Sequence, residues 1–178
     1  MQKMLLHTCC GPCSIYPLQR IRGNFDVTCY FFNPNIHPYK EFTRRLQTLR
    51  EYAYAEKLKL EVDKTYCLEE FLSACMLNED RCEYCYKLRM TQAAQFAKAK
   101  GFDVFSTTLL VSPFQNHELL VDICEQVSKD VGIAFHYEDY REGFEIGKQF
   151  SKDRGMYNQG YCGCIFSERD RYERRYVD

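Results

Sequence analysis

Short apolar runs alternate along this chain with segments whose apolar residues recur at helical spacing, and this alternation limits the fold more than any other feature. A repeated strand–helix order places successive strands in parallel and packs the helices against the faces of the sheet. We therefore expect an α/β fold with three layers and a mostly parallel sheet. Strands are expected at residues 3–8, 27–32, 58–62, 104–111 and 133–137, and helices at residues 12–21, 42–53, 68–77, 85–100 and 120–131.

Length and composition suggest one α/β domain over residues 1–178, ending in a polar segment. A hydrophobic content of 46% is enough for a core, and the net charge of −1 does not mark the whole chain as a nucleic-acid binder. We find no apolar run of about 18 residues and no secretory leader, which predicts no membrane association and a cytoplasmic location. In a reducing cytoplasm, thiols serve metal binding or redox chemistry more often than disulfide frameworks.

The chain has 11 cysteines, and most of them gather in tight groups of three, two and two residues. The first group separates the first expected strand from the first helix, at the sheet edge where ligands bind in such folds. A phosphate-binding loop would place glycines there, so thiols at this point favour a metal or redox centre. The groups are Cys9, Cys10 and Cys13; Cys82 and Cys85; and Cys162 and Cys164.

Spacing within the first two groups favours an iron–sulfur cluster. The Cys82-x-x-Cys85 pair suits either zinc or iron. Adjacent thiols at Cys9 and Cys10 are unusual for zinc, whereas the separate iron corners of a 4Fe–4S cluster can each take one of them. Zinc remains the alternative. Cys13 is left undecided between a further ligand, a ligand to another metal and a residue of the helix face.

Cys162 and Cys164 are separated by one residue, and a disulfide across so short a gap is strained and easily reduced. The pair therefore suits a dithiol that cycles, with metal ligation as the competing role. Gly160 and Gly163 would let this loop approach another group closely. The remaining cysteines are isolated and are expected in the core: Cys29, Cys67, Cys75 and Cys124.

Other polar residues are expected near the same sheet edge. We interpret His7 as a hydrogen-bonded core residue, and the loop at residues 33–37 should lie beside the cysteines. The hydroxyls within residues 106–113 suit either internal packing or contact with a polar substrate. The C-terminal tail carries Arg169, Arg171, Arg174 and Arg175 interleaved with Tyr172 and Tyr176; it could meet RNA, but an equal number of acidic residues favours a solvated helix.

Motifs in a fixed order give the chain a family resemblance. It resembles the cobalamin-independent epoxyqueuosine reductases from residue 5 to about residue 167. The motifs are His-Thr-Cys-Cys-Gly-Pro-Cys-Ser at 7–14, Tyr-Phe-Phe-Asn-Pro-Asn-Ile-His-Pro at 30–38, Cys-x-x-Cys-Tyr-x-Leu-Arg at 82–89, Ser-Thr-Thr-Leu-Leu-Val-Ser-Pro at 106–113 and Tyr-Cys-Gly-Cys-x-x-Ser at 161–167.

The resemblance implies a fold related to the adenine-nucleotide alpha-hydrolase group. It also implies a redox-active pair at Cys162 and Cys164, and it leaves room for an additional iron ion nearby. The implied substrate is epoxyqueuosine at the wobble position of the tRNA anticodon loop, and the product is queuosine. The implied 4Fe–4S cluster is held by Cys9, Cys10, Cys82 and Cys85.

Removing an epoxide oxygen as water consumes two electrons and two protons, so an external electron donor is required. The proton donor is left open among His7, His37, Tyr161 and water. For tRNA phosphates we expect Arg44, Arg45, Lys87 and Arg89, with Tyr39 or Tyr86 stacking on a base. Two rival functions remain at this point: a metal-free thiol–disulfide oxidoreductase and a zinc-stabilised RNA-binding module.

Overall fold

The sheet is parallel throughout and has the strand order β3-β2-β1-β4-β5. The computed structural model describes residues 1–173, so the tail residues Arg174, Arg175 and Tyr176 lie outside it. The strand order reverses between β1 and β4, which is where parallel α/β folds bind their ligands. The strands are β1 (Gln2–His7), β2 (Phe25–Phe31), β3 (Lys59–Val62), β4 (Val104–Thr107) and β5 (Ala134–Phe135).

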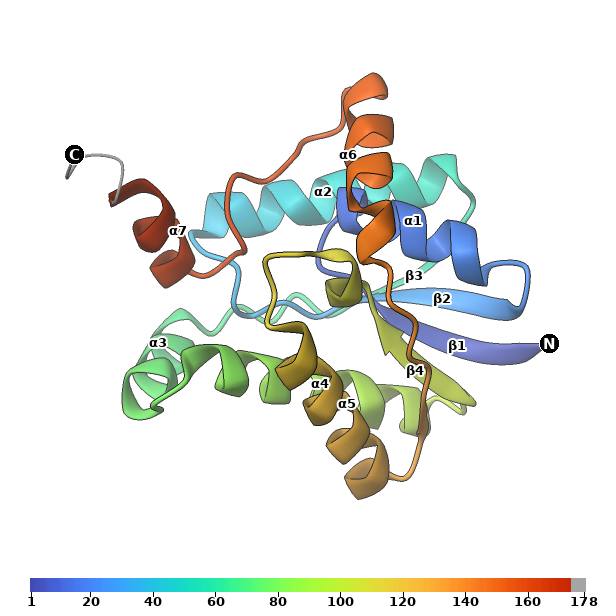
Figure 1. Ribbon diagram of the computed structural model, residues 1–178, viewed down its shortest axis with the longest axis horizontal. Coiled ribbons are helices and arrows are strands. Elements are labelled where there is room, and N and C mark those ends of the chain that lie inside the picture. Colours follow the sequence, from blue (N-terminus) through green and yellow to red (C-terminus); the bar gives the residue numbers. More distant parts are fainter. Residues whose placement is uncertain (174–178) are drawn as a thin grey trace.

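Helices cover both faces of the sheet and give the predicted three layers (Figure 1). One face carries α1 (Gly11–Ile21), α2 (Tyr39–Ala55) and α6 (Phe144–Asp153). The other face carries α3 (Leu68–Leu77), α4 (Arg81–Ala99) and α5 (His117–Val131). The short helix α7 (Ile165–Tyr172) lies beyond the carboxyl edge of the sheet (Figure 1).

Burial of β1 on both faces explains why its sequence is apolar without alternation. Met4, Leu5 and Leu6 are all fully buried between the two helix layers. The predicted apolar stripe of α2 is also confirmed, because Phe42, Leu46, Leu49 and Ala53 are buried. At about 25 cal/mol per Å² of apolar surface, this continuous burial is the main stabilising contribution to the fold.

The predicted strand at residues 104–111 is wrong beyond Thr107. Thr107 pairs with His7, the last residue of β1, so the ladder has no partner strand further along. The Thr107 hydroxyl accepts a hydrogen bond from the Leu109 backbone amide, and residues Thr108–Val111 form the 3₁₀ helix η1 instead. The strand expected at residues 133–137 is likewise reduced to Ala134–Phe135.

Helix α4 begins one turn before the position that its apolar pattern predicted. The Asp80 carboxylate accepts hydrogen bonds from the backbone amides of Cys82 at 2.8 Å and Glu83 at 3.1 Å, which is an N-cap. The Cys82-x-x-Cys85 pair consequently lies on the first turn of a helix rather than in a loop.

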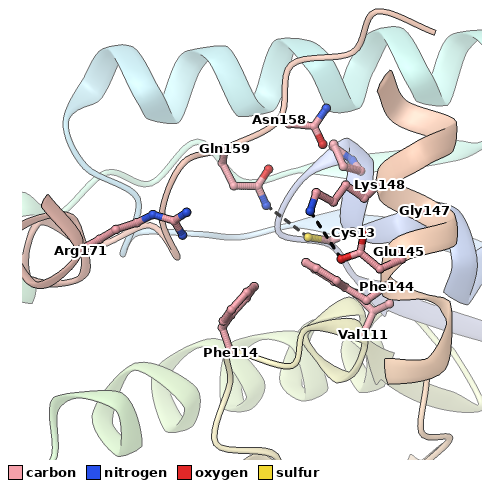
Figure 2. A pocket seen from close by; sticks show the side chains of 11 residues that line it. Cys13, Val111, Phe114, Phe144, Glu145, Gly147, Lys148, Asn158, Gln159 and Arg171 are labelled. Atoms are coloured by element: carbon pink, nitrogen blue, oxygen red, sulfur yellow. Dashed lines mark hydrogen bonds and ion pairs between the residues drawn. The ribbon is translucent and has the colours of Figure 1, made fainter. Parts of the chain in front are cut away.

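The carboxyl edge of the sheet collects the segments that carry the sequence motifs. The cysteine loop follows β1, and the Asn33 side chain from the loop after β2 donates a hydrogen bond to the Thr8 carbonyl at 2.9 Å. Beyond this edge, α6, α7 and the loop after η1 surround a pocket (Figure 2). Among residues 1–173, none of the helices is sufficiently long and apolar to cross a bilayer.

Candidate metal centre

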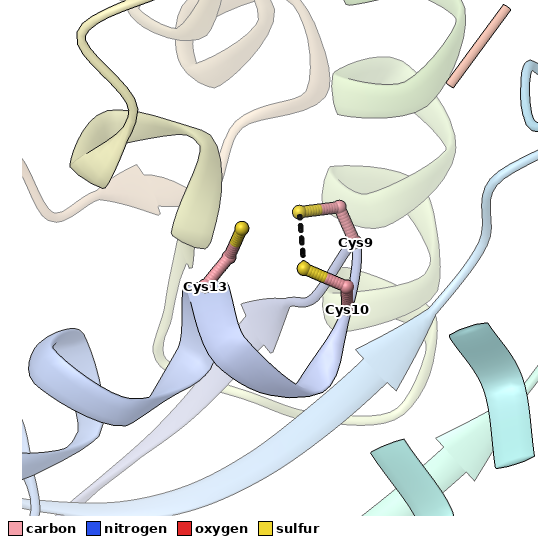
Figure 3. A group of neighbouring side chains, drawn as sticks. All are labelled: Cys9, Cys10 and Cys13. Carbon is pink, nitrogen blue, oxygen red and sulfur yellow. Dashed lines mark hydrogen bonds between the residues drawn. The ribbon is translucent and has the colours of Figure 1, made fainter. Parts of the chain in front are cut away.

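Three cysteine side chains converge where β1 turns into α1 (Figure 3). The sulfur atoms of Cys9, Cys10 and Cys13 all lie within 4.8 Å of one another, and those of Cys9 and Cys10 are 3.8 Å apart. Cys9 and Cys10 are buried. The Gln159 side-chain amide donates to the sulfur of Cys10 at 3.0 Å and to that of Cys13 at 3.3 Å. A buried, hydrogen-bonded set of thiols like this fits metal binding.

The thiols of this triad shift one another's pKa in opposite directions. Hydrogen bonds from Cys10 and Cys13 hold the pKa of the Cys9 thiol well below its ordinary value. Burial instead raises the pKa of Cys10. The thiolate is the form that binds metal ions, so a lowered thiol pKa within the triad favours metal binding.

Cys82 and Cys85 lie on the first turn of α4, with Cys82 exposed and Cys85 half-buried. Burial raises the pKa of Cys85 to about 12. Within residues 1–173, the triad is the one group of at least three Cys, His, Asp or Glu ligands that approach within 4.8 Å of one another. Cys82 and Cys85 therefore do not join the triad at the spacing of a single ion.

The buried Arg89 side chain has no acidic partner among residues 1–173. It is only 1% exposed; its Nη2 donates to the Asn33 side-chain oxygen at 2.7 Å, and its Nε has no hydrogen-bond partner. Its Nη1 lies 3.8 Å from the sulfur of Cys85. Burial disfavours the charge on this guanidinium, but the thiols of Cys85 and Cys9 favour it, and its pKa is raised.

A buried cation needs a compensating anion, because an unpaired buried charge costs several kcal/mol. Around Arg89 the groups able to supply that anion are thiols rather than carboxylates. Thiolates, or an anionic cluster held by thiolates, would supply the missing charge. The thiol donors and the orphaned guanidinium nitrogen therefore fit a metal centre beside the β1 loop.

A second buried arginine, Arg45, holds the loop that carries Cys162 and Cys164. Its guanidinium donates to the Cys162 carbonyl at 2.7 Å, to the Tyr161 carbonyl at 2.9 Å and to the Glu41 carboxylate at 2.7 Å. The Gly163 carbonyl accepts from the His37 backbone amide at 2.8 Å. A side chain at Gly163 would start 3.0 Å from the Asn35 amide nitrogen, so the close approach predicted for this glycine is confirmed.

Both thiols of this loop are free. Cys162 is exposed, and its sulfur accepts a hydrogen bond from the Gln115 side-chain amide at 3.3 Å. Cys164 is the N-cap residue of α7, where its sulfur faces the Ser167 backbone amide at 3.4 Å. The loop is thus fixed through its backbone, while Cys162 is exposed as a residue and lines the cavity.

Cys9, Cys13 and Cys162 line one cavity of about 520 Å³. A smaller cavity of about 200 Å³ adjoins it, and both are lined by Cys13 and Phe114 (Figure 2). The first and third cysteine groups therefore face a shared space, as expected for segments at one sheet edge. Of the hydroxyls within residues 106–113, those of Thr108 and Ser112 line the larger cavity, whereas Ser106 is bonded to the His136 carbonyl.

His7 is a hydrogen-bonded core residue, as predicted. Its ring nitrogens contact the Thr107 hydroxyl at 2.9 Å and the Phe32 carbonyl at 3.1 Å, and burial lowers its pKa to about 3. His37 is buried against aromatic rings, and burial lowers its pKa as well. Tyr161 lines the cavity, but its hydroxyl donates to the His37 carbonyl.

The structure corrects several predicted contacts with RNA and one predicted core residue. Arg45 and Arg89 are each 1% exposed, so they cannot reach phosphates and instead serve the two cysteine loops. Tyr86 is 3% exposed and its hydroxyl donates to the Gln115 side chain at 2.6 Å, so it cannot stack on a base.

Cys67 is only half-buried, at the N-cap of α3. Arg44, Lys87 and Tyr39 are exposed, and Cys29, Cys75 and Cys124 are buried as predicted.

Two site residues were missed by the sequence interpretation because amides carry no spacing signal. Gln115 and Gln159 donate to cysteine sulfurs from loops far away in the sequence. Their contacts depend on tertiary folding alone. Gln115 stands next to the noted motif at residues 106–113, which was the one available hint.

Comparison with known proteins gives consistent matches over nearly the whole chain. The family model "Epoxyqueuosine reductase QueH" matches residues 4–170. Proteins of that name from Dehalococcoides mccartyi and Thermotoga maritima are 34% and 32% identical, covering 96% and 98% of this chain and 94% of each relative. The relative from Acinetobacter baylyi is 35% identical over 94% of this chain and 81% of its own length.

A solved structure supports the fold assignment. It is described as the predicted subunit of a tRNA methyltransferase from Methanocaldococcus jannaschii, and its TM-score is 0.54 at 12% identity. The alignment covers 84% of this chain and 76% of that one. This likeness concerns the fold alone.

Proposed function

The chain belongs to the epoxyqueuosine reductase QueH family and is an oxidoreductase of queuosine biosynthesis, and from this premise we propose that it converts epoxyqueuosine to queuosine at the wobble position of tRNA. The observation that carries the proposal is that Cys162 lines the same cavity as Cys9 and Cys13, two members of the cysteine triad. A metal-free thiol oxidoreductase would leave that triad and the orphaned charge of Arg89 without a role.

The proposed cofactor is a 4Fe–4S cluster held by Cys9, Cys10, Cys82 and Cys85. Such a cluster, when bound, supplies single electrons at low potential. The supporting observation is Arg89, whose guanidinium lies beside Cys85 and interacts with Cys9 but has no carboxylate within residues 1–173. Cys13 would then remain available for an additional iron ion nearby.

The proposed role of Cys162 and Cys164 is that of a redox-active dithiol. Their oxidation to a disulfide releases two electrons and two protons, which is what an epoxide consumes on becoming an alkene and water. An external electron donor must reduce the pair again before the next turnover. The accessible position of Cys162, with Gln115 donating a hydrogen bond to its sulfur, supports this role.

Protons for the departing oxygen would come from the cavity rather than from the buried histidines. With a pKa of about 3, His7 is neutral near pH 7 and its ring is committed to Thr107 and Phe32. Tyr161 lines the cavity, but its hydroxyl serves the His37 carbonyl. The thiols of the dithiol and cavity water therefore fit the role best.

The proposed partner is the anticodon loop of tRNA. Arg44 and Lys87 are exposed and can reach phosphates, and Tyr39 is exposed on the same helix as Arg44. Recognition of single-stranded loops by such cations and aromatic rings is the usual mode for RNA.

The test is turnover by protein purified without oxygen. Wild-type protein, tRNA containing epoxyqueuosine and a low-potential reductant should yield queuosine, measured by mass spectrometry of the digested nucleosides. Cys162→Ser should abolish product, whereas Cys67→Ser, a matched change at a half-buried cysteine outside the site, should not. Full turnover by Cys162→Ser would remove the dithiol role, and absence of product with cluster-loaded wild type would overturn the proposed activity.

A further inference from the structure

The pocket in front of the cysteine triad has an aromatic entrance that the chemistry above does not use. Phe114 and Phe144 line both adjoining cavities, and their rings are 5.6 Å apart in an edge-to-face arrangement. Figure 2 shows the Phe114 ring extending toward the space between Arg171 and Cys13. The face of Phe114 that Phe144 does not cover is open to a ligand.

Phe114 is 75% exposed although the loop that carries it is well fixed. Its backbone amide donates to the Ser112 hydroxyl at 3.3 Å. The following residues are held by Tyr86, whose hydroxyl donates to the Gln115 side chain and accepts from the Asn116 amide at 3.2 Å. A large apolar ring that an ordered loop presents to solvent indicates a contact surface, because disorder of the loop does not account for its exposure.

Within the described part of the chain, the same pocket holds one cation without a partner. Among its basic residues, Arg81 pairs with Asp170, and Lys148 pairs with Glu145 at 3.5 Å. Arg171 of α7 lines both cavities, and its side chain makes no ion pair or hydrogen bond within residues 1–173. Its guanidinium points into the pocket opposite Cys13 (Figure 2). An uncompensated guanidinium at a pocket entrance is suited to an anion such as a phosphate.

We propose that Phe114 is the platform on which the purine-like ring of the modified nucleotide stacks, and that Arg171 contacts a phosphate of the same RNA strand. This inference rests on the proposed function. A base must leave the loop stack before its substituent can reach sulfur atoms inside a cavity, and enzymes hold such bases against aromatic side chains. With the ring on Phe114, the substituent that carries the epoxide extends inward to the space lined by Cys9, Cys13 and Cys162.

The two residues make different contributions, so a salt titration separates them. Stacking on an aromatic ring is insensitive to salt, and its loss weakens binding by about five- to hundredfold per base. One phosphate contact contributes about 0.7 to the slope of log affinity against log salt for a single strand. Phe114→Ala should therefore lower affinity at every salt concentration with an unchanged slope, whereas Arg171→Gln should reduce the slope and Arg171→Lys should retain it.

The experiment measures fluorescence anisotropy of a labelled anticodon stem-loop containing epoxyqueuosine, with anaerobic holoprotein at several salt concentrations. Phe114→Tyr should bind like wild type. The matched control is Tyr54→Ala, which removes an aromatic ring that is 89% exposed at the far end of α2 and should leave affinity unchanged. Iron content and far-UV circular dichroism of each variant report whether the site and the fold are intact.

Wild-type affinity for Phe114→Ala would overturn the stacking role, and so would equal weakening by Phe114→Ala and Phe114→Tyr, which would indicate a structural role of the loop. An unchanged slope for Arg171→Gln would overturn the phosphate contact. Wild-type protein that binds the RNA through Phe114 yet forms no queuosine would contradict the proposed function alone, so the two failures are distinguishable.

Discussion

Among single substitutions at the buried residues of α2, replacement of Arg45 should destabilise the protein most. The Arg45→Met variant keeps the length and apolar character of the stem but removes the guanidinium. Two backbone carbonyls of the loop at Tyr161 and Cys162 lose their donors, and the buried Glu41 carboxylate keeps only the hydrogen bond from Tyr157 at 2.7 Å. Breaking a buried charge pair in this way costs about 3–5 kcal/mol.

A double-mutant cycle with Glu41→Gln identifies the source of that cost. Glu41→Gln alone leaves the buried Arg45 guanidinium without its carboxylate and should also cost about 3–5 kcal/mol. The double variant leaves no unpaired charge, so its cost should fall below the sum of the single costs by about 1–3 kcal/mol. The matched control is Arg44→Met, because the neighbouring Arg44 is exposed and its guanidinium lies over the Tyr157 ring, 3.6 Å from the ring centroid.

The assay is urea denaturation of anaerobic protein followed by far-UV circular dichroism. With a urea dependence of about 2 kcal/mol per molar, Arg45→Met should lower the midpoint by about 2 M, and Arg44→Met by less than about 0.5 M. A midpoint for Arg45→Met within about 0.5 M of wild type would refute the reasoning. Strict additivity in the cycle would refute the assignment of the cost to the unpaired Glu41 charge.

Three further outcomes are expected. Asp80→Ala should cost about 1 kcal/mol of stability and lower the iron bound per chain, because the Asp80 N-cap orients the first turn of α4. Asp80→Asn should restore both the stability and the iron content. Unaltered iron content in Asp80→Ala would contradict this expectation. Arg89→Met should shift the reduction potential of the centre to a more negative value in a redox titration, because it removes a positive charge and a donor beside Cys85; an unchanged potential would place the centre elsewhere. Combined Arg44→Gln and Lys87→Gln should reduce the salt dependence of tRNA binding by about 0.7 for each phosphate that these side chains bind in the wild type. An unchanged salt slope would exclude these two side chains from the interface.

The fold was largely predictable from the sequence because its strands are buried on both faces. Continuous apolar runs and a clear helical stripe, as at Leu46 and Leu49, report burial directly. The prediction failed where burial continued but pairing stopped, as in the 3₁₀ segment Thr108–Val111, whose residues are buried although no strand pairs with them. An apolar run in the sequence indicates that a segment is buried, but it does not indicate where the neighbouring strand ends.

The candidate site was predictable in its cysteines and poorly predictable in its arginines. Cysteine groups carry a spacing signal, and the topology explains why the loops after β1 and β2 meet. Arg45 and Arg89 looked like surface cations because an isolated arginine in a helix usually is one. Their burial depends on carbonyls and thiols from distant segments, which a local pattern cannot reveal.

The central claim is that sulfurs from separate segments surround inorganic iron, and the direct measurement is iron and acid-labile sulfide per chain in anaerobically purified protein. For one cluster we expect about four iron atoms and about four sulfides per wild-type chain. An additional iron ion would raise the iron value and leave the sulfide value unchanged. Both values should fall strongly in Cys9→Ala and in Cys82→Ala but not in Cys67→Ala. Protein that contains zinc without sulfide, or a Cys82→Ala variant that keeps its full iron and sulfide, would contradict the account.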